Sequence, residues 1–282
     1  MPILSIFPHS AGTALRFTYT LPDTGKAYII LRKLANDFTG ETDPAATVVK
    51  VGMGQSESFL DFQFLINGTL YYYKPYWTAD GITWTGETVR SATPAATYVP
   101  ESPDALTFLR ERIDSAMQVA LARGELNHPN GAIQVLTASP TEESTTFPVV
   151  TLHLTSESSD VRGLGDGVGI DFQPTETSWR ETKGWLSRVQ IAVVGWSLNP
   201  DEREALRRAL RDAVIANLDL FDAAGLLTVD FSQQNVEDFQ SYNAPIYQTI
   251  GQFSCLAPSI VGSDYGVVTA VERTLFFNAQ QI

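Results

Sequence analysis

Short runs of alternating apolar and polar residues fill the first third of the chain. They are Leu15–Thr20, Ala27–Arg32, Ser58–Phe62, Gly68–Trp77 and, after a turn at Ala79–Gly81, Thr83–Thr85. A period of two, with many aromatic and β-branched residues, is typical of strands that bury one face. We therefore predict that residues 1–95 form a small all-β sandwich.

Residues 96–102 have the small, polar and proline-containing composition of a linker. Beyond them a helix is predicted, because apolar residues recur at helical spacing at Leu106, Leu109, Ile113, Met117 and Ala120. We expect Ser102 to be its N-cap, Pro103 to occupy its first turn and Gly124 to end it.

A second helix is predicted from Asn199 to about Ala223. It opens with Asn199-Pro200-Asp201-Glu202, which has the pattern of a capping box with proline in the first turn. Its apolar stripe comprises Leu206, Leu210, Val214, Leu218 and Phe221. Four arginines lie on the other faces, where Glu204 and Asp212 are their expected partners: Arg203, Arg207, Arg208 and Arg211.

Strands surround these helices. They are predicted at Ile133–Thr137, Val149–Leu154, Ser187–Trp196, Leu226–Phe231, Ala244–Leu256 and Gly266–Phe277, the last two forming a hairpin around Ser259–Tyr265. A long loop rich in Gly, Ser, Asp and Thr is predicted over Ser156–Lys183, and a loop of this length is usually functional or a projecting hairpin. Residues 103–282 are thus predicted to form an α+β domain, with a mostly antiparallel sheet packed by two helices.

The negative charge is concentrated in this second part. The net charge is −13, and residues 1–100 hold 7 Lys+Arg against 8 Asp+Glu, whereas residues 101–282 hold 12 against 24. An acidic surface repels phosphates, which argues against sequence-specific DNA binding. Simple solubility is the other interpretation of this charge.

Residues suited to catalysis are sparse. His9, His128 and His153 are far apart, and Cys255 is the only cysteine. No zinc-ligand spacing or phosphate-binding loop occurs, and Gly163–Gly169 departs from the dinucleotide fingerprint at Val168. We predict no catalytic, cofactor-binding or metal-binding residue, and we expect that the protein is not an enzyme.

No apolar run reaches the ~20 residues that span a bilayer. The first residues, Met-Pro-Ile-Leu-Ser-Ile-Phe-Pro-His, lack the basic region and cleavage site of a signal peptide. We therefore expect synthesis in the cytoplasm and no membrane partner.

The stretch Leu65–Tyr73, Leu-Ile-Asn-Gly-Thr-Leu-Tyr-Tyr-Tyr, resembles fibronectin type III and similar immunoglobulin-like modules. In that family a Leu and a Gly-Thr turn precede a strand whose tyrosine anchors the corner. The resemblance covers roughly the first third of the chain and makes Trp84–Ala92 the final strand. Pro75 falls inside the preceding strand, where proline removes a ladder donor.

A second resemblance covers about residues 100–282. It is carried, in order, by Phe147–Leu154, the Gly-rich Arg162–Gly169, the strand Val189–Trp196, the helix Asp201–Val214 and the terminal hairpin. This order resembles that of the tail terminator, or tail completion, proteins of long-tailed bacteriophages. The resemblance implies a structural virion protein, made in the host cytoplasm, whose hexameric ring caps the tail tube and joins it to the neck.

The same resemblance implies the partners. They are other copies of the chain, the tail tube, neck or connector proteins and the sheath, while DNA passes through without specific binding. We hypothesise that four acids of the long loop face the bore or the neighbouring tube subunit: Asp160, Asp166, Asp171 and Glu176. We further hypothesise that Arg203, Arg207 and Arg211 contact a neighbouring subunit, because rings need a head-to-tail interface.

Two other functions stay open at this point. A glycan- or surface-binding accessory protein of a virion or cell surface would use Tyr71, Tyr73, Trp77 and Trp84 on one exposed face. A glycosidase with a fibronectin-like accessory module would need two carboxylates roughly 5 to 9.5 Å apart in a cleft.

Overall fold

The computed structural model describes residues 3–53, 56–140, 145–160, 178–238 and 245–266. The contacts within the chain divide it into two compact units, described separately below. Unit 1 comprises Met1–Val99, Pro174–Trp179 and Ser263–Ile282, and unit 2 comprises Pro100–Gln173 and Arg180–Gly262, so the outermost residues of the two longest strands are grouped with unit 1. The predicted linker 96–102 holds a short strand, β9 (Val99–Pro100), which pairs with the last described strand of the chain.

Unit 1 is a β-sandwich. One sheet has the order β1-β2-β5, formed by β1 (Ile3–Pro8), β2 (Leu15–Thr20) and β5 (Ser56–Asp61). The other has the order β4-β3-β6-β7, with β8 also paired to β6; it contains β3 (Ala27–Lys33), β4 (Thr47–Gly52), β6 (Tyr71–Thr78), β7 (Trp84–Gly86) and β8 (Arg90–Ala92). The all-β prediction for this part is confirmed, although β1 and β4 were not among the predicted strands.

Aromatic side chains fill the space between the two sheets. Phe17 of β2 meets Tyr73 of β6 edge to face with ring centroids 4.8 Å apart, and Tyr19 lies 4.6 Å from Tyr28 of β3. All four side chains have no exposed surface. Burial of this much aromatic area is the main contribution to the stability of a small sandwich.

A buried ion pair joins the two sheets at one end of this core. Arg32 of β3 donates to Asp61 of β5 over 2.7 Å and to the carbonyl of Gln63 over 3.0 Å. Tyr73 donates to the same carboxylate over 3.0 Å. Burial, assisted by the negative charge of Asp61, raises the pKa of Tyr73, so its hydroxyl stays protonated and remains a donor.

The tyrosine corner expected from the resemblance is confirmed. The Ile66 N–H donates to the hydroxyl oxygen of Tyr71 over 3.1 Å. Gly68, in the turn between them, has a φ of 80°, which glycine adopts without strain.

Pro75 explains why the expected final strand Trp84–Ala92 is split in two. β7 pairs with β6 over Tyr76–Thr78, and β8 pairs with it over Tyr71–Tyr73. Pro75 lies in the gap, with its carbonyl accepting from Glu87 N–H on that side. In an antiparallel sheet the N–H and C=O groups of one residue point to the same neighbouring strand. The N–H that proline lacks would therefore point into the gap between β7 and β8, where no strand residue needs it.

Unit 2 is built on a sheet with the order β10-β11-β12-β14-β13, to which β9 adds at β14. Its strands are β10 (Gln134–Leu136), β11 (Val149–Ser159), β12 (Ser178–Ser197), β13 (Leu227–Asp238) and β14 (Ile246–Gly266). β10 and β11 are parallel, whereas β11–β12 and β13–β14 are antiparallel.

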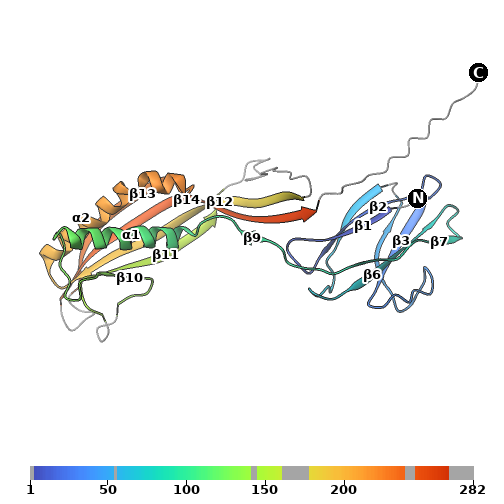
Figure 1. The fold of residues 1–282 in the computed structure, drawn as a ribbon, viewed down its shortest axis with the longest axis horizontal. Coiled ribbons are helices and arrows are strands. Elements are labelled where there is room, and N and C mark those ends of the chain that lie inside the picture. The colour runs from blue at the N-terminus through green and yellow to red at the C-terminus, as the bar shows by residue number, and fades with distance from the viewer. Residues whose placement is uncertain (1–2, 54–55, 141–144, 161–177, 239–244, 267–282) are drawn as a thin grey trace, which may run out of the picture. The chain divides into compact units, whose positions relative to one another are not determined.

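The helices α1 (Ala105–Ala122), α2 (Pro200–Ala216) and α3 (Leu218–Ala223) cover one face of this sheet (Figure 1). Their apolar faces and the facing strand residues form one core, which includes Leu109, Met117, Leu206, Leu210, Phe221, Leu152, Ile191 and Phe253. Cys255 belongs to it, and burial raises the pKa of its thiol to about 11. The cysteine therefore behaves as a small apolar residue.

The predicted start of α1 is wrong by two residues, whereas its end is confirmed. The N-cap is Asp104, whose carboxylate accepts from Thr107 N–H over 2.8 Å, and Ser102 instead accepts from Ile260 N–H over 3.0 Å. At the other end Gly124 has a φ of 70°, and the N–H of Glu125 reaches the Ala120 carbonyl over 3.0 Å, which is a Schellman motif.

The second predicted helix is two helices. Asn217 has φ −106° and ψ 9°, and its side-chain amide donates to the Ala213 carbonyl over 2.8 Å, which ends α2 and starts α3. The break turns Leu218 out of the predicted stripe, and it is 45% exposed. At the N-terminus of α2 the Asn199 side chain accepts from Asp201 N–H. Glu202 does not accept directly from Asn199 N–H, as in a capping box; the hydroxyl of Ser197 lies between them, accepting from Asn199 N–H and donating to Glu202.

Two predicted connections in unit 2 are wrong, because strands extend beyond the core. Ser156–Ser159 and Ser178–Lys183, predicted as loop, belong to β11 and β12, which leaves at most residues 160–177 between them. Ser259–Tyr265, predicted as the turn of a terminal hairpin, lies inside β14, so the observed hairpin is β13–β14. Most of the predicted strand Gly266–Phe277 lies outside the described residues.

Replacing the cap of α1 should destabilise unit 2. Asp104→Ala removes the only side-chain acceptor of the first turn, with an expected loss of about 1 kcal/mol in the free energy of unfolding. Urea denaturation followed by far-UV circular dichroism measures it. An Ala substitution at Arg123, which is largely exposed at the other end, is the matched control and should change the free energy by less than about 0.5 kcal/mol.

Asp43, in the loop after β3, should make the stability of unit 1 pH-dependent. It accepts from Thr39 N–H, Ala45 N–H and Lys33 Nζ over 3.0 to 3.1 Å, and these hydrogen bonds, that of Thr39 first, lower the pKa of Asp43 to about 2. A carboxylate with a lowered pKa stabilises the fold above its unfolded pKa of about 4 and ceases to do so as the pH falls through 2.

The expected result is that Asp43→Asn melts at a lower temperature than the unsubstituted chain at pH 6, and that this difference shrinks between pH 4 and pH 2. Asp23→Asn, at an exposed turn, corrects for the loss of one negative charge. A difference in Tm that stays constant over this pH range would contradict the assignment.

Candidate functional site

Of the four acids predicted to act in the long loop, one is described. Asp160 follows β11, its N–H donates to the Leu186 carbonyl over 2.8 Å, and its carboxylate lies 3.6 Å from Arg188 of β12. Asp166, Asp171 and Glu176 lie outside the described residues. Whether the four acids come together therefore stays a prediction.

The three arginines predicted as subunit contacts lie along α2 and pair within the chain. Arg207 meets Glu204 over 2.9 Å and Arg211 meets Asp212 over 2.8 Å, as predicted, while Arg203 reaches Glu237 of β13 over 3.1 Å. The hydrogen bond from Arg207 is the main cause that lowers the pKa of Glu204. Arg203 is mostly covered, so Arg207 and Arg211 are the two available to a partner.

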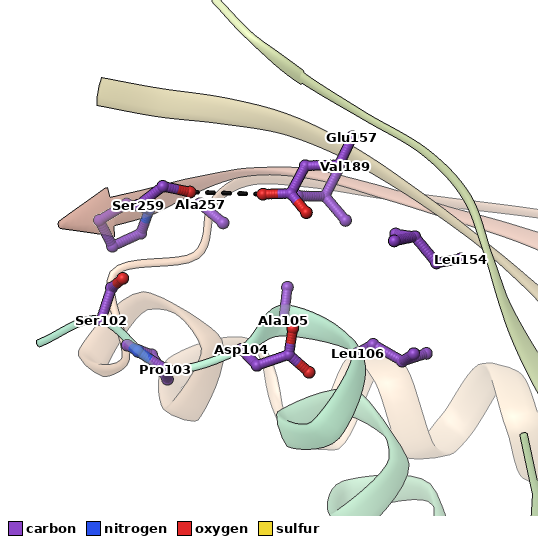
Figure 2. A pocket seen from close by; sticks show the side chains of 11 residues that line it. Ser102, Pro103, Asp104, Ala105, Leu106, Leu154, Glu157, Val189, Ala257 and Ser259 are labelled. Carbon is purple, nitrogen blue, oxygen red and sulfur yellow. Dashed lines mark hydrogen bonds between the residues drawn. The ribbon is translucent and has the colours of Figure 1, made fainter. Parts of the chain in front are cut away.

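A pocket opens where the start of α1 faces β11 and β14 (Figure 2). Its volume is about 200 Å³, and its lining contains no His, Cys, Lys or Arg. Glu157 accepts from Ser259 over 3.4 Å, and Ser259 lies 2.7 Å from the hydroxyl of Ser187. Asp104 and Ser102 are engaged in the backbone hydrogen bonds described above.

The polar groups of this pocket therefore form hydrogen bonds within the chain that stabilise the fold. No nucleophile in it lies beside a basic side chain, and it is smaller than the ~300–1,000 Å³ of most ligand sites. The pocket holds two carboxylates, but Asp104 caps α1 and Glu157 accepts from Ser259, and the glycosidase alternative stays a prediction. Within the described ranges, no group of three or more His, Cys, Asp or Glu side chains could hold a metal ion.

The aromatic residues of the glycan-binding alternative do not share an exposed face. Tyr71 is 5% exposed and Tyr73 is fully buried, because both point into the core of the sandwich. Trp77 packs against that core and donates to Glu87 over 2.7 Å. The core-packing interpretation of this cluster is confirmed for these three residues, and this alternative loses its proposed platform.

An apolar loop of unit 1 is exposed instead. Between β5 and β6, Phe62, Phe64 and Ile66 are 66%, 91% and 65% exposed, and no residue from Phe62 to Leu70 is charged. Phe64 has a φ of 58°, a left-handed conformation that costs a residue with a side chain about 1 kcal/mol. Strain at an exposed aromatic residue suggests selection for display of its side chain.

This loop is held by the buried groups beneath it. Arg32 binds the Gln63 carbonyl, Leu65 is buried in the core, and the tyrosine corner fixes Ile66. Such anchoring lowers the entropy that a partner would have to remove on binding. The sequence carries a signal for this loop, since five of the seven residues from Leu60 to Ile66 are large and apolar, but the predicted strand Ser58–Phe62 includes only the first two of these five.

In unit 2, the sheet face opposite the helices carries a buried apolar cluster at one end, formed by Val149, Val194, Trp196 and Ile246. Beyond that cluster the face is polar and nearly uncharged. Side chains there, at positions that alternate with the core, include His153, Gln190, Gln252, Gln234, Ser232 and Ser254. Over the described paired residues of β11, β12, β13 and β14, Arg188 is the only basic residue of this face, and it lies beside Asp160. We call this surface the open sheet face.

One rim of that sheet is the β13 edge, defined here as the outer side of Phe231–Val236. β13 pairs with β14 on one side, and on its other side the described strands offer no partner. The edge carries no charge and no proline.

No helix in the described part of the chain is long and apolar enough to cross a membrane. No family model matches the sequence, and no curated protein matches it. The similarities found for this chain are therefore to solved structures.

Three solved structures resemble parts of the chain. An Fn3-like protein from Clostridium thermocellum is 18% identical with a TM-score of 0.28, and the match covers 33% of this chain and 91% of that one. A pectate lyase from Pectobacterium carotovorum is 12% identical with a TM-score of 0.27, over 34% and 28%. The sheath/tube terminator of the extracellular contractile injection system PVC, in its extended state, is 17% identical with a TM-score of 0.34, over 64% and 66%.

The chain thus spans about a quarter of the lyase and 66% of the terminator. A likeness of fold at these identities does not carry function.

Proposed function

We propose that this chain is a structural subunit of a tail-like particle, in which a ring of six copies caps the tail tube, joins it to the neck and lets DNA pass. The observation that carries the proposal is the order of elements in unit 2. β11, β12 and α2 follow one another in the order on which the resemblance to tail terminators rests, and a hairpin, β13–β14, comes after them in place of the predicted one.

The open sheet face supports passage of DNA. Proteins bind DNA phosphates chiefly through Lys and Arg, and each such contact slows movement along the duplex. The described open sheet face has one arginine, already beside an acid, and unit 2 belongs to the part of the chain with the larger negative charge. A surface of Gln and Ser beside repelling acids would let a duplex slide without holding it.

The apolar loop of unit 1 supports contact with a protein partner of the particle, such as the tube or the sheath. Replacing Phe64 by Gly removes both its strain and its aromatic side chain. We expect Phe64→Gly to raise the free energy of unfolding by about 1 kcal/mol and yet to weaken binding to the particle.

Chemical denaturation and co-sedimentation with tail tubes measure these two effects. Ile82→Gly, at an 84% exposed residue in another turn of the same unit, is the control and should change neither by much. Unchanged binding of Phe64→Gly would remove the loop from the interface.

The proposal as a whole is tested by electron microscopy of the purified chain alone and mixed with tail tubes. Six-fold rings and capped tube ends are expected. Arg207→Glu should reduce ring formation if α2 contacts a neighbour, whereas Arg123→Glu, at an exposed arginine of α1, should not. A chain that stays monomeric and leaves tube ends bare would refute the proposed function.

A further inference from the structure

The β13 edge has the properties of a strand that pairs with another chain. From Asp230 to Asp238, β13 follows β14 residue by residue, and the only irregularity lies before Asp230, near Thr228 with its φ of 49°. The edge itself is therefore regular over its whole length. A regular edge presents its free N–H and C=O groups at the spacing that an incoming strand requires.

Soluble proteins usually protect such edges with lysines, prolines, bulges or short strands. Phe231–Val236, Phe-Ser-Gln-Gln-Asn-Val, has no charged residue, no proline and no bulge.

We propose that the β13 edge binds the segment Val267–Phe277 of a second copy of this chain as an added strand. The segment reads Val-Val-Thr-Ala-Val-Glu-Arg-Thr-Leu-Phe-Phe, and its β-branched and aromatic residues favour a strand. Its eleven residues are enough to cover the nine-residue regular stretch Asp230–Asp238. The inference deepens the proposed ring, because it names a contact between neighbouring copies.

A segment of the same copy that turned back along β14 would stop short of this edge. Leu256 is the partner of Leu227, and β14 continues from there for ten residues to Gly266, or about 33 Å at ~3.3 Å per residue. A segment that turned back at once would cover about 36 Å in its eleven residues. Phe277 would then end level with the start of β13, short of Phe231–Val236.

The return path along β14 is also occupied. The N–H of Glu101, next to β9, donates to the Ile260 carbonyl over 2.9 Å, and Ile260 N–H donates to Ser102. A returning segment would have to displace these hydrogen bonds. Binding of a segment from a second copy requires no such loss.

Charge disfavours pairing of two β13 edges with each other. An antiparallel pair centred on Gln234 would place Asp230 of one copy opposite Asp238 of the other at both ends. Like charges directly opposite in a sheet are destabilising. The segment Val267–Phe277 brings one arginine, Arg273, and one acid, Glu272, so it carries no net charge to this edge.

A donated strand makes the contact head-to-tail, since the edge and the segment are different surfaces. Such heterologous contacts generate rings when the rotation closes. The inference therefore also predicts that association is lost when either surface alone is changed.

Light scattering on the purified chain tests the contact. The full chain should associate, whereas a chain that ends at Gly266 and the full-length variant Val271→Pro should be monomers, because proline interrupts strand pairing. Ala279→Pro lies beyond the segment, keeps every residue of it, and should associate like the unsubstituted chain. Val271→Pro keeps the test valid if the shortened chain fails to fold.

Hydrogen exchange locates the contact. A synthetic Val267–Phe277 peptide added to the shortened chain should slow amide exchange in Phe231–Val236 by about tenfold or more, and a Val271→Pro peptide should not. Equal masses of the full and shortened chains, or protection only elsewhere, would overturn the proposal. A shortened chain that still associates would point to pairing of two β13 edges or to another surface.

The two proposals fail separately. If tube ends are capped by six-fold rings while the shortened chain associates like the full one, the ring stands and this contact does not. If the segment drives association through β13 but no tube is capped, the contact stands and the terminator function does not.

Discussion

Asp61→Ala is expected to cost unit 1 about 3–5 kcal/mol, because it leaves the guanidinium of Arg32 buried without a counter-charge. Both side chains are almost completely covered, at 7% and 3% exposure. The change also removes the acceptor of the Tyr73 hydroxyl, which lies in the core of the sandwich. A loss of this size is a large part of the stability of an ordinary domain.

Urea denaturation with hydrogen exchange read out peptide by peptide measures the effect and its location. Protection should fall in β2, β3 and β6, where the buried aromatic residues lie. Asp37→Ala removes an acid that is 66% exposed and pairs with Lys33, and it should cost less than about 0.5 kcal/mol.

A combined variant distinguishes the loss of the ion pair from the cost of leaving the charge of Arg32 buried and unpaired. Arg32→Met with Asp61→Leu and Tyr73→Phe removes all three polar groups together. It should be more stable than Asp61→Ala alone, since a buried pair can often be replaced by apolar residues at little cost. If Asp61→Ala proves no worse than Asp37→Ala, the ion pair does not hold the two sheets.

Phe253→Ala should destabilise unit 2 by about 3–5 kcal/mol, because the side chain is fully buried and its removal leaves a cavity under the helices. Its ring lies 5.4 Å from that of Phe221 in α3, so the short helix should lose protection first. The measurement is the shift in the urea midpoint, together with amide exchange in α2 and α3.

Leu220→Ala serves as the comparison for this variant. Leu220 lies in the same short helix but is 46% exposed, so its replacement should cost less than about 1 kcal/mol. Similar losses in the two variants would mean that α3 is not packed on β14 through Phe253.

The sequence predicts those elements well whose apolar period matches their burial. β2 has the predicted bounds, β3 extends one residue further, and Gly124 ends α1 as expected. Each of these rests on local physics, namely alternation across a sandwich or the left-handed conformation of glycine at a helix end. The tyrosine corner was predictable for a different reason, since the resemblance of Leu65–Tyr73 supplied it.

The elements that were not predicted depend on contacts that the local pattern of apolar residues does not reveal. β11, β12 and β14 run beyond the core, where Ser, Thr, Glu and Gln pair through their backbones and leave no apolar period to detect. The break at Asn217 depends on one side chain capturing a helix carbonyl. Ser102 and Asp104 are both good caps, and only the fold, which assigns Ser102 to Ile260, decides between them.

The candidate site was partly predictable. The pairing of Arg207 with Glu204 follows from their spacing of three residues on α2, whereas Arg211 pairs with its chain neighbour Asp212, which helical spacing does not predict. The exposed Phe62, Phe64 and Ile66 were not foreseen, because an apolar run gives no sign of whether a core or a partner covers it.

Pro75 has a consequence for how unit 1 behaves at high concentration. Pro75 splits one edge of its sheet into β7 and β8, which have three residues each. Edge strands this short offer too few backbone groups for another chain to pair with. The same molecule thus carries one rim that resists polymerisation and another, on β13, that invites it. Conditions that expose β13 without its partner should accordingly make β13, and not the β7–β8 rim, the origin of fibrils.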